Sequence, residues 1–396
     1  MSHINKWIIV SILAILCVII ILPPIIYDYI YPTGGDDTAH HLIVMNTITL
    51  DKPIPEKHLY DGQWIIGYPL ILLREWFNIP LATSFLWFNY LALMGVVIVS
   101  YLVFSGLFNQ WSGLFVSVTS FLLSSNILLF QAGAIFSLIN MGILFPTILY
   151  LGITGYIKRS WGRIIACVCL LVLFGFFHAS GKYLLALPII LLVWVVLRSK
   201  LDSEGKIALA ILAMFIIVLF TVAYIFPSVS SDAGRQWVDG YNLVWILVAC
   251  LVGLWGNKQK IEFRAIALIC IVLVGSFSTL PFWFNNNSAI KPLDKEIIAY
   301  VNSLDGSEFY CNEYVAPYIY ELYLNKTYKP DSGIYIYRSI PMTAGVSHDT
   351  HFNYWENEGL GFDTSEPENL SEVKEFNTEG IAAYVAENTP HFNTGD

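Results

Sequence analysis

The segment PLATSFLWFNYLALMGVVIVSYLVFSGL (residues 80–107) has no charged side chain. A helix needs about 20 consecutive apolar residues to cross the ~30 Å hydrocarbon core of a bilayer. Runs of this length, or slightly shorter, recur near 7–31, 80–107, 112–130, 139–157, 163–179, 183–198, 206–226, 241–256 and 264–284. The sequence therefore predicts an all-α, polytopic membrane bundle of about nine transmembrane helices over residues 1–284.

The first run, 7–31, raises two alternatives, a cleaved signal peptide and an uncleaved membrane anchor. It is long, it contains Pro23-Pro24, and it lacks a small-x-small cleavage site before Tyr27. Signal peptides have a short apolar region and such a cleavage site. These features favour an anchor.

Charge divides the chain in two. Of the 396 residues, 56% are hydrophobic and only 13% are charged, against about 25% charged in soluble domains. Residues 1–284 carry 15 Lys/Arg and 12 Asp/Glu, whereas residues 285–396 carry 6 Lys/Arg and 18 Asp/Glu. We expect residues 285–396 to form a separate acidic, water-soluble domain. A nucleic-acid-binding domain would be basic, so this class is excluded.

Basic residues in the predicted loops orient the bundle, because cytoplasmic loops are enriched in Lys and Arg. Three alternate loops each carry three of them: Lys158, Arg159 and Arg163; Arg198, Lys200 and Lys206; Lys258, Lys260 and Arg264. The pattern predicts a multi-pass protein of the plasma membrane with a cytoplasmic N-terminus. With nine spans, the acidic C-terminal domain is extracytoplasmic.

The acidic region has the pattern of a small α/β domain. An amphipathic helix is predicted over Pro292–Leu304, where Ile297, Ile298, Val301 and Leu304 share one face. Short β-prone runs follow at Glu308–Cys311 and Gly333–Tyr337, with a helix at Val315–Leu324 between them. Residues 341–378 are polar and rich in turn-forming residues, and no structure is predicted there.

The first outer loop, residues 32–79, is long and contains two predicted helices. Asp36–Leu50 has apolar residues at helical spacing and begins with two carboxylates, which suit the positive end of a helix. Trp64–Phe77 is apolar but too short to span a bilayer. It suits an interfacial or re-entrant helix.

The concentrated acid and histidine motif of the chain is Gly34-Gly35-Asp36-Asp37-Thr38-Ala39-His40-His41. Each histidine lies four positions after a carboxylate, so Asp36/His40 and Asp37/His41 share helix faces. One hypothesis is that a carboxylate acts as general base on an acceptor hydroxyl. Another is that Asp36 and Asp37 bind a divalent metal, Mg or Mn, that neutralises a phosphate leaving group. The structural alternative is an acidic helix start with two interfacial histidines.

The arrangement of one long span, a large outer loop and an acidic motif just after the membrane resembles the GT-C superfamily. These multispanning glycosyltransferases take sugars from polyprenyl-phosphate donors. Four further segments are similar to recurring patterns of such proteins: Tyr60-Asp61-Gly62-Gln63-Trp64, Gly67-Tyr68-Pro69-Leu70, Asn140-Met141-Gly142 with Phe145-Pro146, and His178-Ala179-Ser180-Gly181. The likeness covers residues 1–284.

The resemblance implies sugar transfer from a polyprenyl-phosphate-sugar donor to a glycan, lipid or protein acceptor on the outer face. It makes Asp36 or Asp37 the catalytic base or a metal ligand. The implied substrate-binding residues are His40, His41, Asp61, Tyr68, His178, Lys182 and Arg235. Taken singly, His178, Lys182 and Arg235 equally suit residues at the membrane edge.

Two other functions are compatible with the sequence. One is a noncatalytic multispanning membrane protein whose outer acidic domain binds a cell-envelope partner. The other is a flippase or exporter of lipid-linked sugars, which would use ionisable residues inside the spans. Such residues are scarce in the apolar runs, which disfavours transport.

Overall fold

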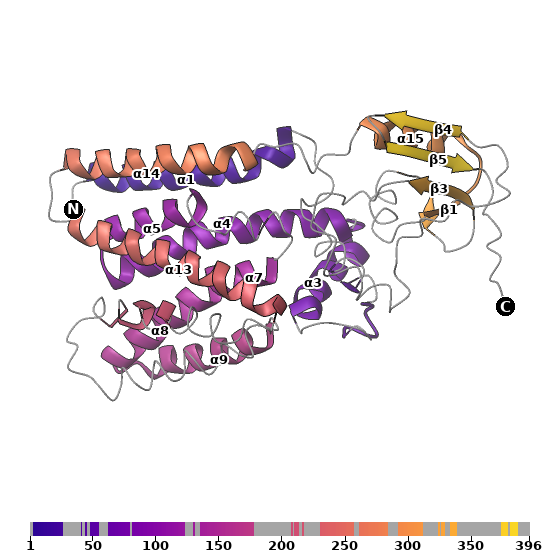
Figure 1. Ribbon diagram of the computed structural model, residues 1–396. Helices are drawn as coiled ribbons and strands as arrows, with labels where there is room; N and C mark the ends of the chain where they lie inside the picture. The colour runs from indigo at the N-terminus through magenta and orange to yellow at the C-terminus, as the bar shows by residue number, and fades with distance from the viewer. Residues whose placement is uncertain are drawn as a thin grey trace.

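The computed structural model describes residues 3–26, 41, 44–45, 48–54, 62–79, 81–122, 130, 135–177, 207–208, 210–213, 216–217, 230–256, 261–283, 292–311, 324, 326–328, 333–338, 374–378 and 381–386. They are mostly helical (Figure 1). The helices are α1 (His3–Ile26), α3 (Gly62–Phe77), α4 (Leu81–Leu107), α5 (Gln110–Leu122), α7 (Ile135–Ile139), the π-helix η1 (Asn140–Leu144), α8 (Phe145–Ile157), α9 (Trp161–Phe177), α13 (Ser230–Gly256), α14 (Ile261–Trp283) and α15 (Pro292–Ser303). The strands are β1 (Glu308–Cys311), β2 (Thr327–Tyr328), β3 (Ile334–Arg338), β4 (Lys374–Thr378) and β5 (Ile381–Ala386).

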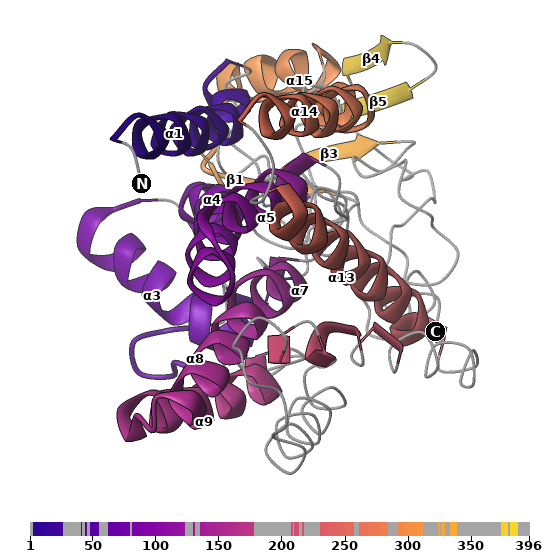
Figure 2. The same ribbon diagram turned by 90° about the vertical axis from the view of Figure 1, so that its left-hand side faces the viewer.

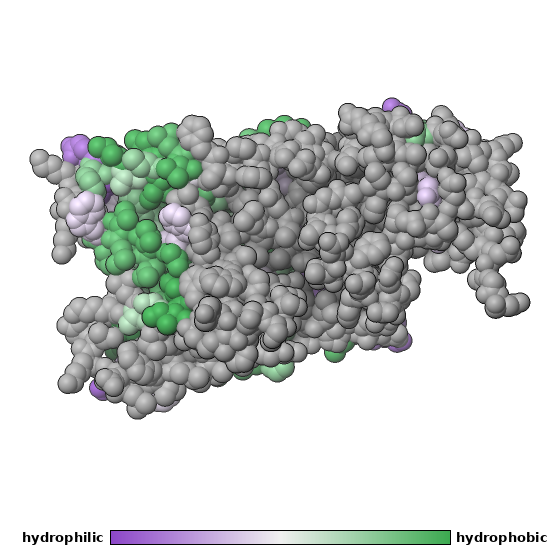
Figure 3. Space-filling model, viewed as in Figure 1, coloured by the Kyte–Doolittle hydropathy of each residue, from purple (hydrophilic) through white to green (hydrophobic). Residues whose placement is uncertain are grey.

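Three stretches of helix within the described residues are long and apolar enough to cross a membrane. They are Trp7–Ile26 in α1, Thr83–Leu107 in α4, and Ile135–Ile157, which joins α7, η1 and α8. Large apolar side chains are exposed on helices such as α1, α4, α9, α13 and α14, and Figure 3 shows part of this surface as a green patch at one end of the bundle. Soluble monomers rarely expose apolar patches of that extent. These features are consistent with a membrane protein.

The predicted apolar runs agree with the helices where both can be compared. The runs 80–107, 139–157, 163–179, 241–256 and 264–284 overlap α4, α7 to α8, α9, α13 and α14. The run 112–130 begins within α5, which is described to Leu122. Run 183–198 lies outside the described residues, and 206–226 is described only at a few positions. The number of nine spans therefore stays a prediction.

Helix α5 is the centre of the bundle, with α4, α13 and α14 packed around it (Figures 1 and 2). Every residue from Trp111 to Leu122 is buried. Small residues allow this close packing: a side chain at Gly253 of α13 would overlap the backbone of Ser112. Polar groups bond within the bundle, since Ser117 Oγ donates to the Val97 carbonyl oxygen at 2.7 Å.

Helices α7, η1 and α8 form one continuous rod that packs antiparallel to α9. The π-turn is closed by the Phe145 N–H, which donates to the Asn140 carbonyl oxygen. Pro146 follows directly and has no N–H with which to continue an α-helical ladder. A π-turn takes up one extra residue, so we attribute η1 to Pro146.

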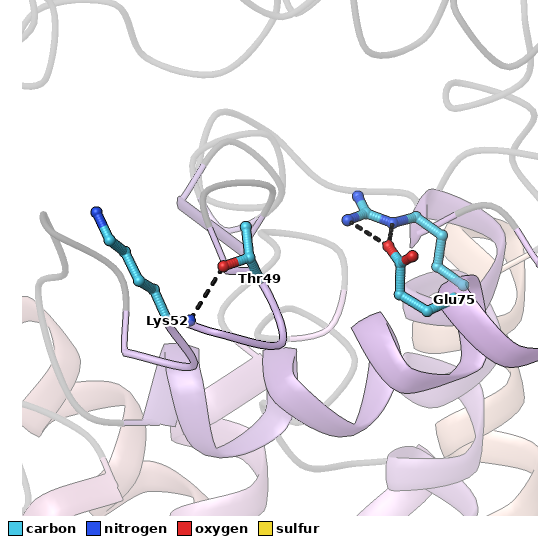
Figure 4. A network of polar contacts seen from close by, with 4 residues as sticks. Thr49, Lys52 and Glu75 are labelled. Atoms are coloured by element: carbon cyan, nitrogen blue, oxygen red, sulfur yellow. Dashed lines mark hydrogen bonds and ion pairs between the residues drawn. The ribbon is translucent and has the colours of Figure 1, made fainter.

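The first loop packs on α3. A side chain at Gly67 would collide with Met45 and Ile48, at 2.9 and 2.5 Å. The helix predicted over Asp36–Leu50 is wrong at its end, because residues 48–50 are not helical. The Lys52 N–H donates to Thr49 Oγ1 at 3.0 Å there (Figure 4). A threonine side chain that bonds the local backbone offers an alternative to the helix.

The helix predicted over Trp64–Phe77 is confirmed as α3, which begins two residues earlier. Near its end, Arg74 forms an ion pair with Glu75 at 3.1 Å (Figure 4). Both side chains are partly exposed. The pair is therefore a surface feature of small energetic weight.

The C-terminal strands form one five-stranded sheet in the order β2-β1-β3-β5-β4. Strands β2, β1 and β3 are parallel, and β5 is antiparallel to both β3 and β4. Helix α15 covers the sheet through a separate hydrophobic cluster: Ile297, Val301, Phe309, Cys311, Leu324, Ile334, Ile336 and Phe376. Figure 1 shows the sheet beyond the end of the bundle at which α3 lies.

The sequence predictions for this region are partly confirmed. Helix α15 and strands β1 and β3 lie where helix and strands were expected. Strand β4 falls inside 341–378, where none was expected, because only Phe376 of Lys-Glu-Phe-Asn-Thr is apolar. Strand β4 is stabilised by its hydrogen bonds to β5, which its own composition does not predict. The helix expected at Val315–Leu324 lies outside the described residues except for Leu324.

Candidate functional site

Five segments that are far apart in the sequence meet at one end of the bundle. They are the first loop, the start of α3, the start of α4, helix α7 and the end of α9. His41 of the first loop contacts α3, α4 and α7, and 2% of its surface is exposed. His41 is the last residue of the Gly34–His41 motif, to which the sequence assigns chemistry.

His41 is held by one polar contact and two aromatic walls. Gln63 of α3, fully buried, has its Nε2 at 3.0 Å from His41 Nδ1. The ring of Phe136 in α7 meets the imidazole edge-on at 4.5 Å, and Phe85 in α4 does so at 6.4 Å. With the amide nitrogen of Gln63 as donor, Nδ1 accepts, and a neutral ring carries its proton on Nε2. The contacts fix the first loop to three helices.

Gly62 brings the start of α3 against the end of α9. A Cβ at this position would overlap the Phe177 carbonyl oxygen and would lie 2.8 Å from the Phe136 ring. Phe136 and Phe177 are themselves in contact, with ring centroids 5.6 Å apart. Only glycine permits this approach. In the chain, Gly62 directly follows Asp61, and Phe177 directly precedes His178.

Asn140 anchors α9 one turn further into the bundle. Its Nδ2 donates to the Phe174 carbonyl oxygen at 3.3 Å. Phe174 lies in the last described turn of α9. Asn140 is fully buried, and its Oδ1 has no hydrogen-bond partner in the described part of the chain. The amide thus joins the π-turn of η1 to the end of α9.

The predicted site residues are only partly covered by the structure. Asp36, Asp37, His40, Asp61, His178 and Lys182 lie outside the described residues. Arg235 is placed by its backbone within α13, and its side chain is not described. His41 is buried as stated above, and Tyr68 lies half-buried on α3 against the main core. The roles assigned to all of these residues stay predictions.

The hypothesis of a Mg or Mn site rests on Asp36 and Asp37, which lie outside the described residues. Within the described part of the chain, no group of three or more His, Cys, Asp or Glu residues has the geometry to hold a metal. His41 uses Nδ1 for its contact with Gln63. The metal site at Asp36 and Asp37 therefore stays a prediction.

Two residues of this end were quoted in sequence motifs without a role: Gln63 and Asn140. Each is an uncharged amide in a mostly apolar stretch of sequence, and each is fully buried. Polar side chains in membrane helices commonly bond across to other helices. That rule gives a signal for Asn140 but does not identify its partner, and it does not apply to Gln63, because α3 is too short to span a bilayer.

A scan against models of known protein families finds no match to this sequence, and a search of curated proteins finds none either.

Proposed function

We propose that the chain is a multispanning membrane glycosyltransferase of the GT-C type. It transfers a sugar from a polyprenyl-phosphate donor to an acceptor on the outer face of the membrane. In this proposal, about nine spans form the membrane domain, the N-terminus is cytoplasmic, and residues 285–396 are an extracytoplasmic acidic domain.

The observation that carries the proposal is the convergence around His41. Gln63 of α3 and Phe136 of α7 contact His41, and Phe177 of α9 packs against Phe136. The motif Asp36–His41 ends at His41, and Asp61 and His178 are chain neighbours of the contacting pair Gly62 and Phe177. These contacts support the proposal, because the residues next to them in the sequence belong to the motifs expected to carry the chemistry.

The proposed reaction needs a base and a stabilised leaving group. The acceptor hydroxyl oxygen attacks the anomeric carbon, and the bond from that carbon to the phosphate oxygen breaks. Asp36 or Asp37 takes the hydroxyl proton. The polyprenyl phosphate leaves with the bonding electron pair, and His178, Lys182 or Arg235 stabilises its charge. A divalent metal held by Asp36 and Asp37 would supply the same stabilisation.

Exchange of the two aspartates tests the proposal in cells that lack the native gene. Envelope glycans are compared by mass spectrometry after complementation with wild type, Asp36→Asn, Asp37→Asn and the double variant. The matched control is Asp51→Asn, because Asp51 is an exposed carboxylate of the same loop. We expect wild type and Asp51→Asn to restore a glycan that the double variant leaves about 10²- to 10⁴-fold reduced.

Full restoration by the double aspartate variant would contradict the catalytic assignment. It would favour the noncatalytic alternative, an outer acidic domain that binds a cell-envelope partner. Under that alternative, deletion of residues 290–396 abolishes function while the aspartate exchanges have no effect.

A further inference from the structure

Helix α3 is mostly apolar on two opposite faces, although only one of them packs on the protein. The buried positions are Gly62, Gln63, Ile66, Gly67, Leu70 and Ile71. The outward positions, spaced three or four residues apart and all exposed, are Pro69, Leu73, Trp76 and Phe77. Trp76 and Phe77 have 68% and 65% of their surfaces exposed. A helix on the surface of a soluble protein would carry polar side chains on that side.

The two charged residues of α3 do not give its outward face a net charge. Arg74 Nη2 lies 3.1 Å from Glu75 Oε1, and Arg74 Nε donates to the same oxygen at 3.2 Å (Figure 4). The two charges cancel within this pair. The outward face therefore suits an apolar partner better than an ionic one.

The exposed aromatic pair, Trp76 and Phe77, lies next to the start of a candidate span. Asn78 ends α3 in the left-handed region, with φ of 54°, and its N–H donates to the Arg74 carbonyl oxygen at 2.9 Å. Only residues 78–80 separate α3 from α4. The result is that the aromatic pair is held close to the first turn of α4.

The length of α4 places this first turn at an edge of the bilayer core. The apolar stretch Thr83–Leu107 has 25 residues, which reach about 37 Å at ~1.5 Å per residue. The hydrocarbon core is ~30 Å thick. A span of that length reaches both edges of the core, so its start and the neighbouring aromatic pair lie at one of them.

Exposed apolar side chains continue along the chain into α4. They recur at helical spacing, at Trp87, Leu91, Ile98 and Leu102. Helices α3 and α4 pack on each other, and Figure 2 shows α3 at the periphery of the bundle. A bilayer that surrounds α4 would therefore also meet α3.

The length of α3 excludes a second span at this place. Its 16 residues fall short of the ~20 that a span requires. Tryptophan is enriched where membrane and water meet, because its ring is apolar and its N–H is polar. A short helix with an exposed aromatic pair beside the start of a span has the features of an interfacial helix.

We infer that α3 lies in the interface between membrane and water and binds phospholipids through Pro69, Leu73, Trp76 and Phe77. The opposite face of the same helix contacts His41 through Gln63. The lipid contact thereby sets the depth of His41 relative to the bilayer. The inference goes beyond the proposed transferase function and does not rest on it, because it concerns position and not catalysis.

The test measures the depth of single side chains in the full chain, reconstituted into phosphatidylcholine vesicles. The three cysteines that are not buried, Cys17, Cys169 and Cys270, are first replaced by alanine. A nitroxide spin label is then attached to one introduced cysteine at a time. Its depth follows from its collisions with oxygen, which concentrates in the bilayer core, and with a water-soluble nickel chelate.

Three positions give the comparison. Trp76→Cys reports on α3. Ile98→Cys is the reference for the bilayer core, because Ile98 is exposed and lies about 22 Å along α4 from Thr83. Lys52→Cys is the reference for water, because Lys52 is an exposed charged residue of the first loop.

We expect the Trp76→Cys label to lie about 5–10 Å below the membrane surface, deeper than Lys52→Cys and shallower than Ile98→Cys. Collision with the chelate equal to that of Lys52→Cys would overturn the inference, because the face would then lie in water. A depth equal to that of Ile98→Cys would overturn it in favour of a re-entrant helix. Spectral broadening that disappears on dilution with unlabelled protein would make the face a contact between two copies, and would likewise overturn it.

Phe77→Cys is the second variant, which guards against loss of folding in the first. Both side chains are mostly exposed, so each variant should unfold in detergent at a temperature close to that of the cysteine-replaced parent. Phe77→Cys should also give an interfacial depth, and a reading equal to that of Lys52→Cys would overturn the inference. The measurement needs no enzymatic activity, so failure of the transferase proposal would leave its outcome unchanged.

Discussion

The two ends of the helical bundle use their polar side chains in opposite ways. At the end that includes the first loop, His41 and Gln63 are buried and face each other. At the end that includes the α8–α9 turn, Lys158 and Arg159 are exposed. At the first end, buried polar side chains hold a loop in place. At the second end, charged side chains are exposed at the surface.

This difference between the two ends indicates which of them is the better candidate for a catalytic site. A buried polar pair is tolerated only if its geometry is satisfied, so it fixes one arrangement of the surrounding segments. Exposed basic residues set orientation and attract anionic lipids, and they impose little internal order. The end around His41 is therefore the better candidate for a catalytic site.

The largest expected effect comes from Gly62. In Gly62→Ala the new methyl group overlaps the Phe177 carbonyl oxygen, a backbone atom that cannot move aside alone. We expect destabilisation of about 3 kcal/mol, at the upper end for overpacking, and loss of the proposed activity. Thermal unfolding in detergent measures the first, and the cellular glycan assay measures the second.

Gly162 provides the matched control for Gly62. It lies in the first turn of α9, and a Cβ there meets nothing within 4 Å. Gly162→Ala should stabilise the protein by up to about 1 kcal/mol through helix propensity. If both exchanges have the same effect, the close approach of α3 to α9 is not a constraint on this fold.

The next largest effect is expected at the pair His41 and Gln63. Either His41→Leu or Gln63→Leu leaves a buried polar partner behind, at a cost of about 1–3 kcal/mol. The double variant should cost less than the sum, with a coupling energy of about 0.5 kcal/mol or more. Urea or thermal unfolding in detergent gives all three values.

Thr49→Ala is the reference for the pair, because it removes a side-chain hydrogen bond that is exposed. Its effect should stay within about 0.5 kcal/mol. Strict additivity of His41→Leu and Gln63→Leu would show that the contact does not hold the first loop.

Features of this fold that depend on neighbouring residues can be predicted from the sequence, whereas contacts between residues far apart in the sequence cannot. The long apolar runs identify helices such as α4 within one residue, because the bilayer requires continuous apolar helix. The contact of His41 with Gln63 spans 22 residues and follows no local period. Strand β4 was missed for the same reason, since its order depends on pairing with β5.

The candidate site also has features that the sequence shows and contacts that only the fold shows. The motif Asp36–His41 is visible in the sequence as a concentration of acid and histidine, and its catalytic role stays a prediction. The neighbours that gather around His41 come from α3, α4 and α7, and only the fold brings them together. Asn140 was visible as an amide in an apolar run, but its bond to Phe174 depends on the packing of η1 against α9.

A smaller loss of stability than at His41 and Gln63 is expected at Arg264, at the opposite end of the bundle. Arg264→Gln removes the bond to Gly256 and the contact with Trp111, at a cost of about 1 kcal/mol. Arg163→Gln should cost less, because Nη1 of Arg163 has no hydrogen-bond partner among the described residues. Equal losses in thermal unfolding would mean that the protein uses both side chains internally.

The sidedness of the two ends tests the central claim most directly. Single cysteines replace Lys52 in the first loop and Arg159 in the α8–α9 turn, both exposed positions, and intact cells are treated with a membrane-impermeant maleimide. The account predicts that Lys52→Cys reacts from outside, whereas Arg159→Cys reacts only after the membrane is opened. Reaction of both cysteines from outside, or of Arg159→Cys alone, would contradict it.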